Sequence, residues 1–353
     1  MKAQKNHMKI IQRSLTAGDG VGTKLPQKNR KHFRSITDLG NHWFKASVEG
    51  FKLIRIPSYF ATCLELTSEN LEGYVRYIDG DRNDLIGKSW LIGKQAVRSE
   101  SADLSRLVDH YMGKSELWLE YFLGLLSHLP QINSHQKHQV IVTCNDVKRH
   151  EPIIHRLATG THKVLMSGQL ATVEIVVEKV LPEGYAALKN HKLTGAVRIV
   201  DFGGGNITIS GFEDDQLIGE PIVKDFGCES LLQDLAGSSS LKSIIKQAPN
   251  LEVLNTSLEK GVKKDSKTGE QFLYYGASKL NILPAYKEAL GKFIDCKLRE
   301  VIKKLDEYVL TGETILVIGG GSKLPFLNVA LKKKGYKISS DGGFDNIKGL
   351  IEG

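Results

Sequence analysis

Asp201-Phe-Gly-Gly-Gly-Asn-Ile-Thr208 directly follows the apolar, β-branched run Ala196-Val-Arg-Ile-Val200. An apolar run that ends at an aspartate and continues into glycines predicts a buried strand followed by a tight turn. Because glycine has no side chain, successive backbone N–H groups of such a turn can approach a phosphate closely. A carboxylate at the strand end can hold a hydrated Mg²⁺ against those phosphates. One such turn, taken alone, is more often structural than functional.

Two further glycine turns follow apolar runs. Asp38-Leu-Gly-Asn-His-Trp-Phe-Lys45 begins 163 residues before Asp201, and Ile318-Gly-Gly-Gly-Ser322 follows a third apolar run. The turns at Asp38 and Asp201 begin alike, which indicates a duplicated domain with a ligand between the halves. The turn at Ile318 is predicted to open a helix, whose N-terminus favours an anion.

Competing nucleotide motifs are incomplete. Gly87-Lys-Ser89 and Gly113-Lys-Ser115 match the end of a P-loop, but Arg82 and Val108 stand where its first glycine is required. No GxGxxG lies between a predicted strand and a predicted helix, which argues against a dinucleotide-binding fold. The three turns above are therefore the candidate ligand site.

The composition is that of an ordinary globular protein: 353 residues, 41% apolar and 25% charged. This length fits one large domain or two of ordinary size. The net charge of +8 lies entirely in residues 1–35, which hold nine basic residues and one acidic residue. These residues are predicted to be a mostly disordered basic arm, either a solvated extension or a contact for DNA or another polyanion. The rest of the chain is neutral, which argues against a uniformly basic nucleic-acid-binding domain.

Features of membrane and secreted proteins are missing from the sequence. No stretch approaches the roughly 18 consecutive apolar residues of a membrane helix, and the charged N-terminus precedes no apolar signal region. The four cysteines form no CxxC pair and are predicted to be buried thiols: Cys63, Cys144, Cys228 and Cys296. These features predict a cytoplasmic protein without membrane contact.

Strand-like and helix-like stretches alternate along the chain, which predicts an α/β fold. The expected strands are a pair within 48–61, then 140–143, 172–180, 196–200, 207–212, 216–223 and 314–318. The expected helices are 116–129, a helix capped by Asp146 that ends near Leu157, 183–189, segments around 227–259 and 280–307, and 322–334. The polar residues 260–270 predict an exposed hairpin or loop.

The three turns together resemble the nucleotide loops of the actin, heat-shock-chaperone and sugar-kinase superfamily. Residues 38–45 are similar to its first phosphate loop, 201–208 to its second, and 318–321 to its adenosine loop. Leu181-Pro-Glu-Gly-Tyr-Ala186 and Phe344-Asp-Asn-Ile-Lys-Gly-Leu350 resemble segments of the ParM/StbA-type plasmid-segregation actins.

This resemblance spans about residues 36–350 and implies an α/β, actin-like ATPase fold. Two similar domains, each a mixed sheet flanked by helices, would enclose a nucleotide cleft. The implied domains are residues 36–195 and 196–339, after the arm of residues 1–35. A C-terminal helix in residues 340–353 would return to the first domain.

The resemblance also assigns roles to residues of the turns. Asp38 and Asp201 would orient Mg²⁺ through its water shell, and Glu183 would polarise the attacking water; these three acids form the implied catalytic set. Contacts to the phosphates are implied for Gly40, Asn41, Lys45, Gly203, Gly204 and Gly205, and contacts to the nucleoside for Gly319, Gly320 and Gly321. Without the resemblance, Glu183 is an acid favoured at a helix start, Lys45 a strand-end lysine and Asp201 a turn former.

Some residues depart from the pattern of the superfamily. His42-Trp43 places bulk where the first loop usually has small residues, which we expect to alter the approach of the phosphates. Residues 142–146 replace a Gly-Leu-Pro-like turn, and Gly205-Asn206 replaces a threonine-rich stretch. All the expected aspartates are present, so nucleotide binding is still predicted.

By resemblance, the chain is an ATPase that binds Mg-ATP between its domains. It would hydrolyse the nucleotide by in-line attack of water and polymerise head-to-tail into filaments that segregate plasmids with a DNA-binding adaptor. The choice between ATP and GTP stays open. Two alternatives remain: a nucleotide-binding scaffold that uses the basic arm for DNA or a partner, and a small-molecule kinase of the same superfamily.

Overall fold

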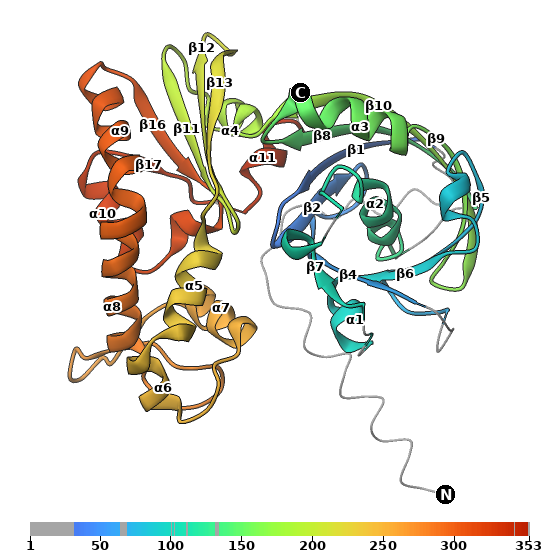
Figure 1. Cartoon of the computed structure of the whole chain (residues 1–353). Helices are drawn as coiled ribbons and strands as arrows, with labels where there is room; N and C mark the ends of the chain where they lie inside the picture. The colour runs from blue at the N-terminus through green and yellow to red at the C-terminus, as the bar shows by residue number, and fades with distance from the viewer. Residues whose placement is uncertain are drawn as a thin grey trace, which may run out of the picture.

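The computed structural model describes residues 32–63, 69–99, 101, 103–110, 112–130, 134–341 and 343–351. These residues form two curved halves, each built around its own sheet (Figure 1). The first sheet has the order β3 (Ile54–Pro57), β2 (Trp43–Val48), β1 (His32–Leu39), β8 (His135–Cys144), β10 (Gln169–Pro182), β9 (Gly160–Met166), β5 (Tyr74–Gly80), β6 (Ser89–Ile92), β4 (Tyr59–Thr62) and β7 (Ser105–Arg106). The second has the order β13 (Gln216–Lys224), β12 (Ile207–Glu213), β11 (Val197–Phe202), β16 (Thr314–Ile318) and β17 (Lys337–Ile338).

The first sheet curls around α2 (Trp118–Leu126), as Figure 1 shows. Every residue of α2 is buried, because its sequence WLEYFLGLL is apolar on nearly all sides and a helix of that kind needs cover all round. Three further helices belong to this part of the chain: α1 (Gly93–Arg98), α3 (Val147–Ala158) and α4 (Tyr185–Asn190).

Helices cover the second sheet and extend beyond it. They are α5 (Cys228–Gly237), α6 (Ser239–Ile245), α7 (Leu251–Lys260), α8 (Leu283–Phe293), α9 (Arg299–Leu310) and α10 (Leu327–Lys333). A π-helical turn, Ile294–Leu298, joins α8 to α9. The apolar faces of these helices and the inner face of the sheet share a core separate from that of the first half.

The chain returns to the first half at its end. After β17 it forms α11 (Asp345–Lys348), which packs against α4 and β1. The C-terminal helix expected to return to the first domain lies in this segment, and its assignment to that domain stays a prediction. The exact domain limits at residues 195 and 339 stay a prediction.

The mixed α/β architecture is confirmed, as are most of the expected strands and helices. Both sheets contain parallel and antiparallel pairs. The hairpin expected in residues 260–270 is present, with β14 (Lys263–Lys264) paired to β15 (Gln271–Phe272). The predicted strand pair within residues 48–61 is wrong: β3 pairs with β2, whereas β4 pairs with β6 and β7.

Two predicted helix starts are too early. The helix expected at Ser322 begins at Leu327, because Pro325 lacks an N–H and Phe326 takes a positive φ of 65°. The helix expected at Glu183 begins at Tyr185, because Gly184 adopts a left-handed conformation at its N-cap.

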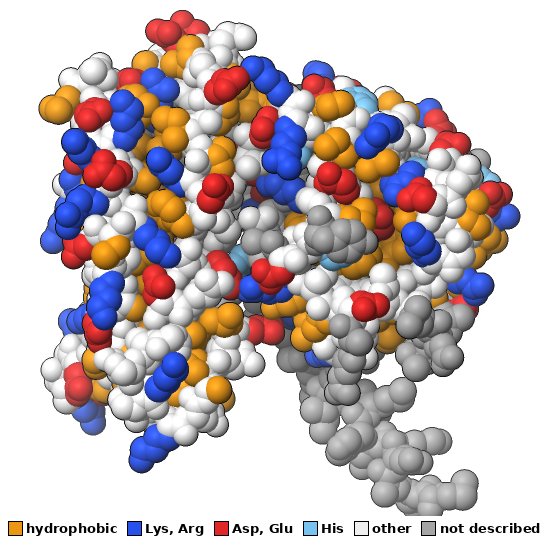
Figure 2. Space-filling view, in the orientation of Figure 1, with side chains coloured by type: hydrophobic (Ala, Val, Ile, Leu, Met, Phe, Trp, Pro, Cys, Tyr) orange, Lys and Arg blue, Asp and Glu red, His pale blue; other side chains and the backbone are white. Residues whose placement is uncertain are grey.

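The expectations from composition agree with the structure only in part. β1 begins at His32, so residues 32–35 belong to a strand and not to the predicted arm, whose remainder lies outside the described residues. Cys144 is buried, but Cys63 and Cys228 are half-buried and Cys296 is exposed, so the prediction of four buried thiols is wrong. Among the described residues, no helix has the length and apolar character that crossing a membrane requires. Basic and acidic side chains are interspersed over the described face in Figure 2, as a neutral body predicts.

Candidate nucleotide site

The strands on either side of the first turn, β1 and β2, place an aspartate and a lysine face to face. Asp38 and Lys45 occupy opposite positions of the β1–β2 pair, and Lys45 Nζ lies 2.7 Å from Asp38 Oδ2. Asp38 is almost fully buried. The turn is closed by the Gly40 N–H, which donates to the Trp43 carbonyl at 3.1 Å, and by Ser58 Oγ, which donates to the Gly40 carbonyl at 2.6 Å. The strand register therefore directs a buried ion pair toward the turn.

The turn after β11 also connects two antiparallel strands, but its glycines expose backbone groups and no side chains. Asp201 lies opposite Thr208 in the β11–β12 pair, and the Gly203 N–H donates to the Asn206 carbonyl at 3.0 Å. The first two N–H groups of α5 donate to the carbonyls of Gly203 and Gly204 at 3.1 and 2.8 Å. The N-terminus of α5 thus fixes the shape of this turn.

The turn after β16 needs glycine for reasons of space. Gly319 has a φ of 80°, and a Cβ there would lie 2.4 Å from Asp201 Oδ1. A Cβ at Gly320 would meet nothing within 4 Å, whereas one at Gly321 would strike the Phe202 ring at 2.5 Å. Gly320 therefore faces open space, and Gly321 serves close packing.

Glu183 lies where the two halves meet. Its N–H donates to the Cys144 carbonyl at the end of β8 at 2.8 Å, and its carbonyl accepts from Ser210 Oγ of β12 at 3.1 Å. Its buried side chain places Oε1 3.5 Å from Lys114 Nζ. Backbone contacts to both sheets thus hold this carboxylate in place.

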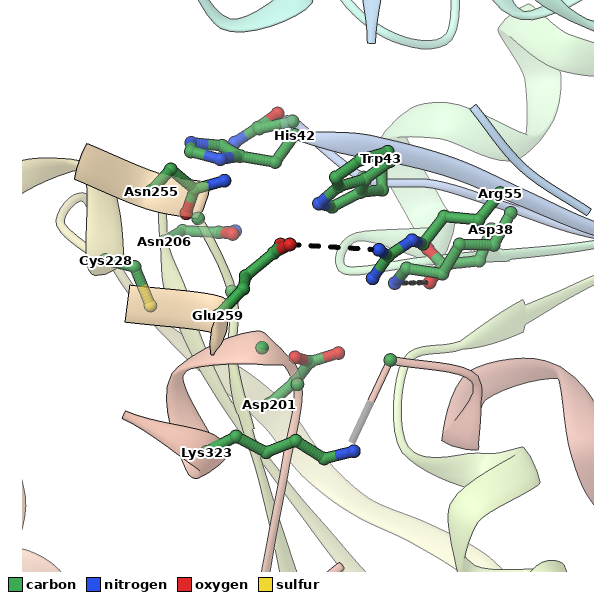
Figure 3. Close-up of a pocket in the computed structure, with 18 of the residues that line it drawn as sticks. Asp38, His42, Trp43, Arg55, Asp201, Asn206, Cys228, Asn255, Glu259 and Lys323 are labelled. Carbon is green, nitrogen blue, oxygen red and sulfur yellow. Dashed lines mark hydrogen bonds and ion pairs between the residues drawn. The ribbon is translucent and has the colours of Figure 1, made fainter. Parts of the chain in front are cut away.

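These features surround one cavity of about 370 Å³ between the halves (Figure 3). Most of the predicted site residues line it together: Asp38, Gly40, Asn41, Lys45, Glu183, Asp201, Gly203, Gly204, Gly319 and Gly320. Gly205 and Gly321 were predicted with them and do not line this cavity. The side of the cavity formed by the second half adds Cys228, Asn255, Leu258, Lys323 and Leu324.

Burial and charge shift the acids and the lysine of the cavity. Burial raises the pKa of Asp201, and the Glu183 carboxylate raises it further. Burial also raises the pKa of Glu183, although Lys114 opposes the shift. Burial lowers the pKa of Lys45, but Asp38, Asp201 and Glu183 outweigh it and raise the pKa. The cavity therefore concentrates negative charge, which a cation would relieve.

The donor set of the cavity fits Mg²⁺ held through water. Mg²⁺ takes oxygen ligands and is usually bound by one or two carboxylates together with waters and substrate phosphates. Asp38 and Asp201 are the strand-end carboxylates of this cavity. No group of three or more His, Cys, Asp or Glu side chains among the described residues is arranged to hold an ion directly. The residues thus fit a metal that arrives with phosphates.

Solved structures superpose on nearly the whole chain. Bacillus thuringiensis ParM with ATP is 17% identical with a TM-score of 0.65, covering 92% of this chain and 98% of that one. The archaeal actin homologue Ta0583 is 13% identical with a TM-score of 0.66, covering 91% and 98%. ParM in a 15-stranded filament from Clostridium botulinum is 16% identical with a TM-score of 0.64, covering 92% and 99%.

The chain has the actin-like fold. The predicted resemblance to ParM-type proteins is confirmed at the level of this fold. The sequence matches no protein-family model and none of the curated proteins compared with it. At identities of 13–17%, these similarities establish the fold, and the activity has to be inferred from the residues of the site.

Within this actin-like fold, His42 reaches from the first half to α5 of the second. Its Nε2 lies 2.8 Å from Glu229 Oε2, and Arg106 Nη1 contacts the other oxygen of Glu229. Burial alone would raise the pKa of Glu229, but His42 and Arg106 together lower it to about 2. His42, the large residue where the first loop usually has a small one, thus forms a contact across the cleft.

Arg55 of the first half and Glu259 of the second form another contact across the cleft (Figure 3). The Arg55 guanidinium stacks 4.0 Å from the Trp43 ring, and its Nη2 lies 4.0 Å from Glu259 Oε2 on α7. A further cavity of about 280 Å³ lies beside the first and shares these three residues. Trp43, Arg55 and Glu259, here called the cleft wall, therefore border both spaces.

Sequence reasoning missed two side chains that reach the acids. Lys114 belongs to Gly113-Lys-Ser115, which was set aside as an incomplete P-loop although it precedes a helix. Asn346 lies in the C-terminal segment, and its Nδ2 donates to Asp201 Oδ2 at 2.6 Å. No local signal links Asn346 to Asp201, because 145 residues separate them.

Proposed function

We propose that this chain is an ATPase that binds Mg-ATP in the cavity between its halves and hydrolyses it. One observation carries the proposal: the cavity gathers two strand-end aspartates, glycine turns and a buried glutamate around a volume of about 370 Å³. In-line attack of water on a γ-phosphate needs positioning and charge stabilisation, and these residues supply groups for both.

Each residue has a role in the proposed reaction. Asp38 and Asp201 would hold Mg²⁺ through its waters, and the bound metal would neutralise charge on the phosphates. Lys45 contacts the β-phosphate, and the backbone of Gly203 and Gly204 wraps the γ-phosphate. Glu183 accepts a proton from the attacking water, and Lys114 favours the ionised form that this step requires.

Two of the compared structures support the nucleotide and the assembly. One is described as ParM with ATP, and another as a ParM filament. We propose the same for this chain: ATP as its nucleotide, with GTP to be tested beside it, and head-to-tail filaments for plasmid segregation. A heterologous contact that does not close a ring generates such a filament.

The remaining parts of the proposal concern partners and place. A DNA-binding adaptor would attach the filament to plasmid DNA, and the basic residues 1–31 would contact a polyanion. The protein would act in the cytoplasm. The domains would be residues 36–195, extended at the start by residues 32–35 of β1, and residues 196–339, with residues 340–353 returning to the first.

Phosphate release and light scattering test the proposal together. The full chain is mixed with Mg-ATP or Mg-GTP, and the experiment is repeated with Glu183→Gln. We expect turnover by the unchanged chain and about a 100-fold loss in the variant, since the side chain that accepts the proton is removed. Glu178→Gln is the matched control, because Glu178 is exposed and lies on β10, the strand that ends at the residue before Glu183.

The outcomes separate the competing functions. Scattering that rises with nucleotide and decays as phosphate is released supports a segregating filament. Normal turnover by a folded Glu183→Gln protein contradicts the assigned role. Nucleotide binding without turnover or assembly favours the scaffold, and phosphate transfer to an added hydroxyl compound favours the kinase.

A further inference from the structure

The short helix α11 lies at the junction of the two halves. It follows β17 of the second sheet and packs on α4 and β1 of the first half. The packing is close: a Cβ added at Gly349 would lie 1.9 Å from the Ala186 carbonyl oxygen. The position of α11 is therefore tightly determined.

Asn346 of α11 is buried and bridges two parts of the candidate site. Its Oδ1 accepts from the Gly184 N–H at 2.9 Å, and its Nδ2 donates to Asp201 Oδ2 at 2.6 Å. The partners fix the orientation of the amide, because a backbone N–H only donates and a carboxylate accepts. One side chain thus joins the residue after Glu183 to the aspartate near the end of β11.

The neighbouring residue anchors this bridge. Asp345 Oδ1 accepts from Ser339 Oγ at 2.7 Å and lies 3.0 Å from His191 Nε2. Ser339 follows β17, whereas His191 ends α4, so Asp345 ties α11 to both halves. The Asn346 amide consequently has little freedom to move away from Asp201.

We propose that Asn346 is a positioning residue that orients Asp201 for the Mg²⁺–nucleotide complex and links it to the Glu183 segment. This inference rests on the proposed function. With Oδ2 held by Asn346, Oδ1 of Asp201 lies beside Gly319 at the cavity wall. A carboxylate that is already oriented avoids the loss of rotational freedom when the metal arrives.

Two variants separate the contacts of Asn346. Asn346→Asp keeps an oxygen acceptor for the Gly184 N–H but sets a carboxylate against Asp201. Asn346→Ala removes both contacts without adding charge. Lys348→Met is the matched control, because Lys348 lies on the same helix and pairs with Asp341 outside the cavity.

Calorimetry with a non-hydrolysable ATP analogue, with Mg²⁺ or with EDTA, gives a readout besides activity. In EDTA, we expect both variants to bind the analogue with an affinity within about 2-fold of that of the wild-type protein. Adding Mg²⁺ should increase the affinity of the variants about 10-fold less than it increases that of the wild-type protein. In turnover assays, kcat should fall about 10- to 100-fold with a smaller change in KM. Lys348→Met should match the unchanged chain in both assays.

The results distinguish this inference from the proposed function. Folded variants, verified by circular dichroism and Tm, that keep the full Mg²⁺-dependent gain and kcat overturn the role of Asn346 alone. A lower Tm with an unchanged Mg²⁺ gain assigns Asn346 a structural role and also overturns the inference. If Asn346→Asp does not fold, Asn346→Ala decides. If the wild-type protein does not bind the analogue at all, both the proposed function and this inference are overturned.

Discussion

The turn after β1 and the turn after β11 share a backbone frame. Asp38 lies opposite Lys45 and Asp201 opposite Thr208, each in an antiparallel pair with the next strand. On its other side, each aspartate-bearing strand pairs in parallel, β1 with β8 and β11 with β16. The apparent duplication in the sequence is thus a duplicated arrangement of three strands.

The two turns differ in what they place on this frame. The first extends side chains, whereas the second has none at its glycines. A Cβ at Gly204 would lie 2.2 Å from the His42 ring, and one at Gly205 would lie 2.2 Å from Asn41 Nδ2. The halves approach this closely because glycines of one turn leave room for side chains of the other.

Because of this difference, we expect the second turn to tolerate added side-chain volume less than the first. The largest effect is expected at Gly227, the N-cap of α5, which packs on the second turn. A Cβ at Gly227 would lie 2.5 and 2.6 Å from the carbonyl oxygens of Gly204 and Gly203, which are backbone atoms. We expect Gly227→Ala to lower the free energy of unfolding by about 2 kcal/mol and to weaken nucleotide binding, because α5 must move off the turn. Urea unfolding and calorimetry measure both effects.

Two other glycines supply controls. Gly237 lies at the far end of α5 with nothing within 4 Å of its added Cβ, so Gly237→Ala should stabilise the protein by about 0.5 kcal/mol. Gly40→Ala, in the first turn, meets the Trp43 carbonyl oxygen at 3.1 Å and Lys45 Nζ at 4.0 Å and should cost less than Gly227→Ala. Equal losses at Gly40 and Gly227 would contradict the difference between the turns.

The contact of Glu229 with His42 and Arg106 predicts a pH dependence of stability. The pKa of Glu229 falls from an ordinary 4.5 to about 2 in the folded chain. A depressed pKa stabilises the fold above pH 4.5, and this stabilisation is lost as the pH falls toward 2. The stability difference between the unchanged chain and Glu229→Gln should therefore shrink below pH 4.5, by up to about 1.4 kcal/mol per pH unit.

Urea unfolding between pH 5 and pH 3 tests this slope. Glu220→Gln is the control, because Glu220 pairs with Lys148 where both side chains are more than four-fifths exposed. Its substitution should change the free energy of unfolding by less than about 0.5 kcal/mol at every pH. A stability difference for Glu229→Gln that stays constant over this range would refute the ionised contact across the cleft.

The sequence predicted those parts of the molecule that depend on local pattern. Apolar runs located β11 and β16, and Asp201 lies near the end of β11, one residue before the strand ends, as an acid at a strand end predicts. The glycine turns and Glu183 were expected in one site, and the cavity brings most of them together. Their roles in catalysis stay predictions.

Contacts between distant segments could not be predicted in the same way. Asn346 meets Asp201 only because the last helix returns to the junction of the halves. Glu229 meets Arg106 across 123 residues. Gly321 does not line the cavity and instead packs against the Phe202 ring, a contact that no spacing rule reveals.

The cleft wall is expected to give the smallest effect. Arg55 and Glu259 are 40% and 44% exposed and lie 4.0 Å apart, so Glu259→Gln should change stability by less than about 0.5 kcal/mol. The substitution should instead increase the solvent exposure of Trp43, because Arg55 without its partner stacks less firmly on the Trp43 ring. Trp90 and Trp118 are buried, so acrylamide quenching of tryptophan fluorescence reports mainly on Trp43 and should rise in the variant.

Glu69→Gln is the control, because Glu69 pairs with Arg76 at 3.8 Å with similar exposure but outside both cavities. Equal quenching in the two variants would mean that Glu259 does not hold the wall.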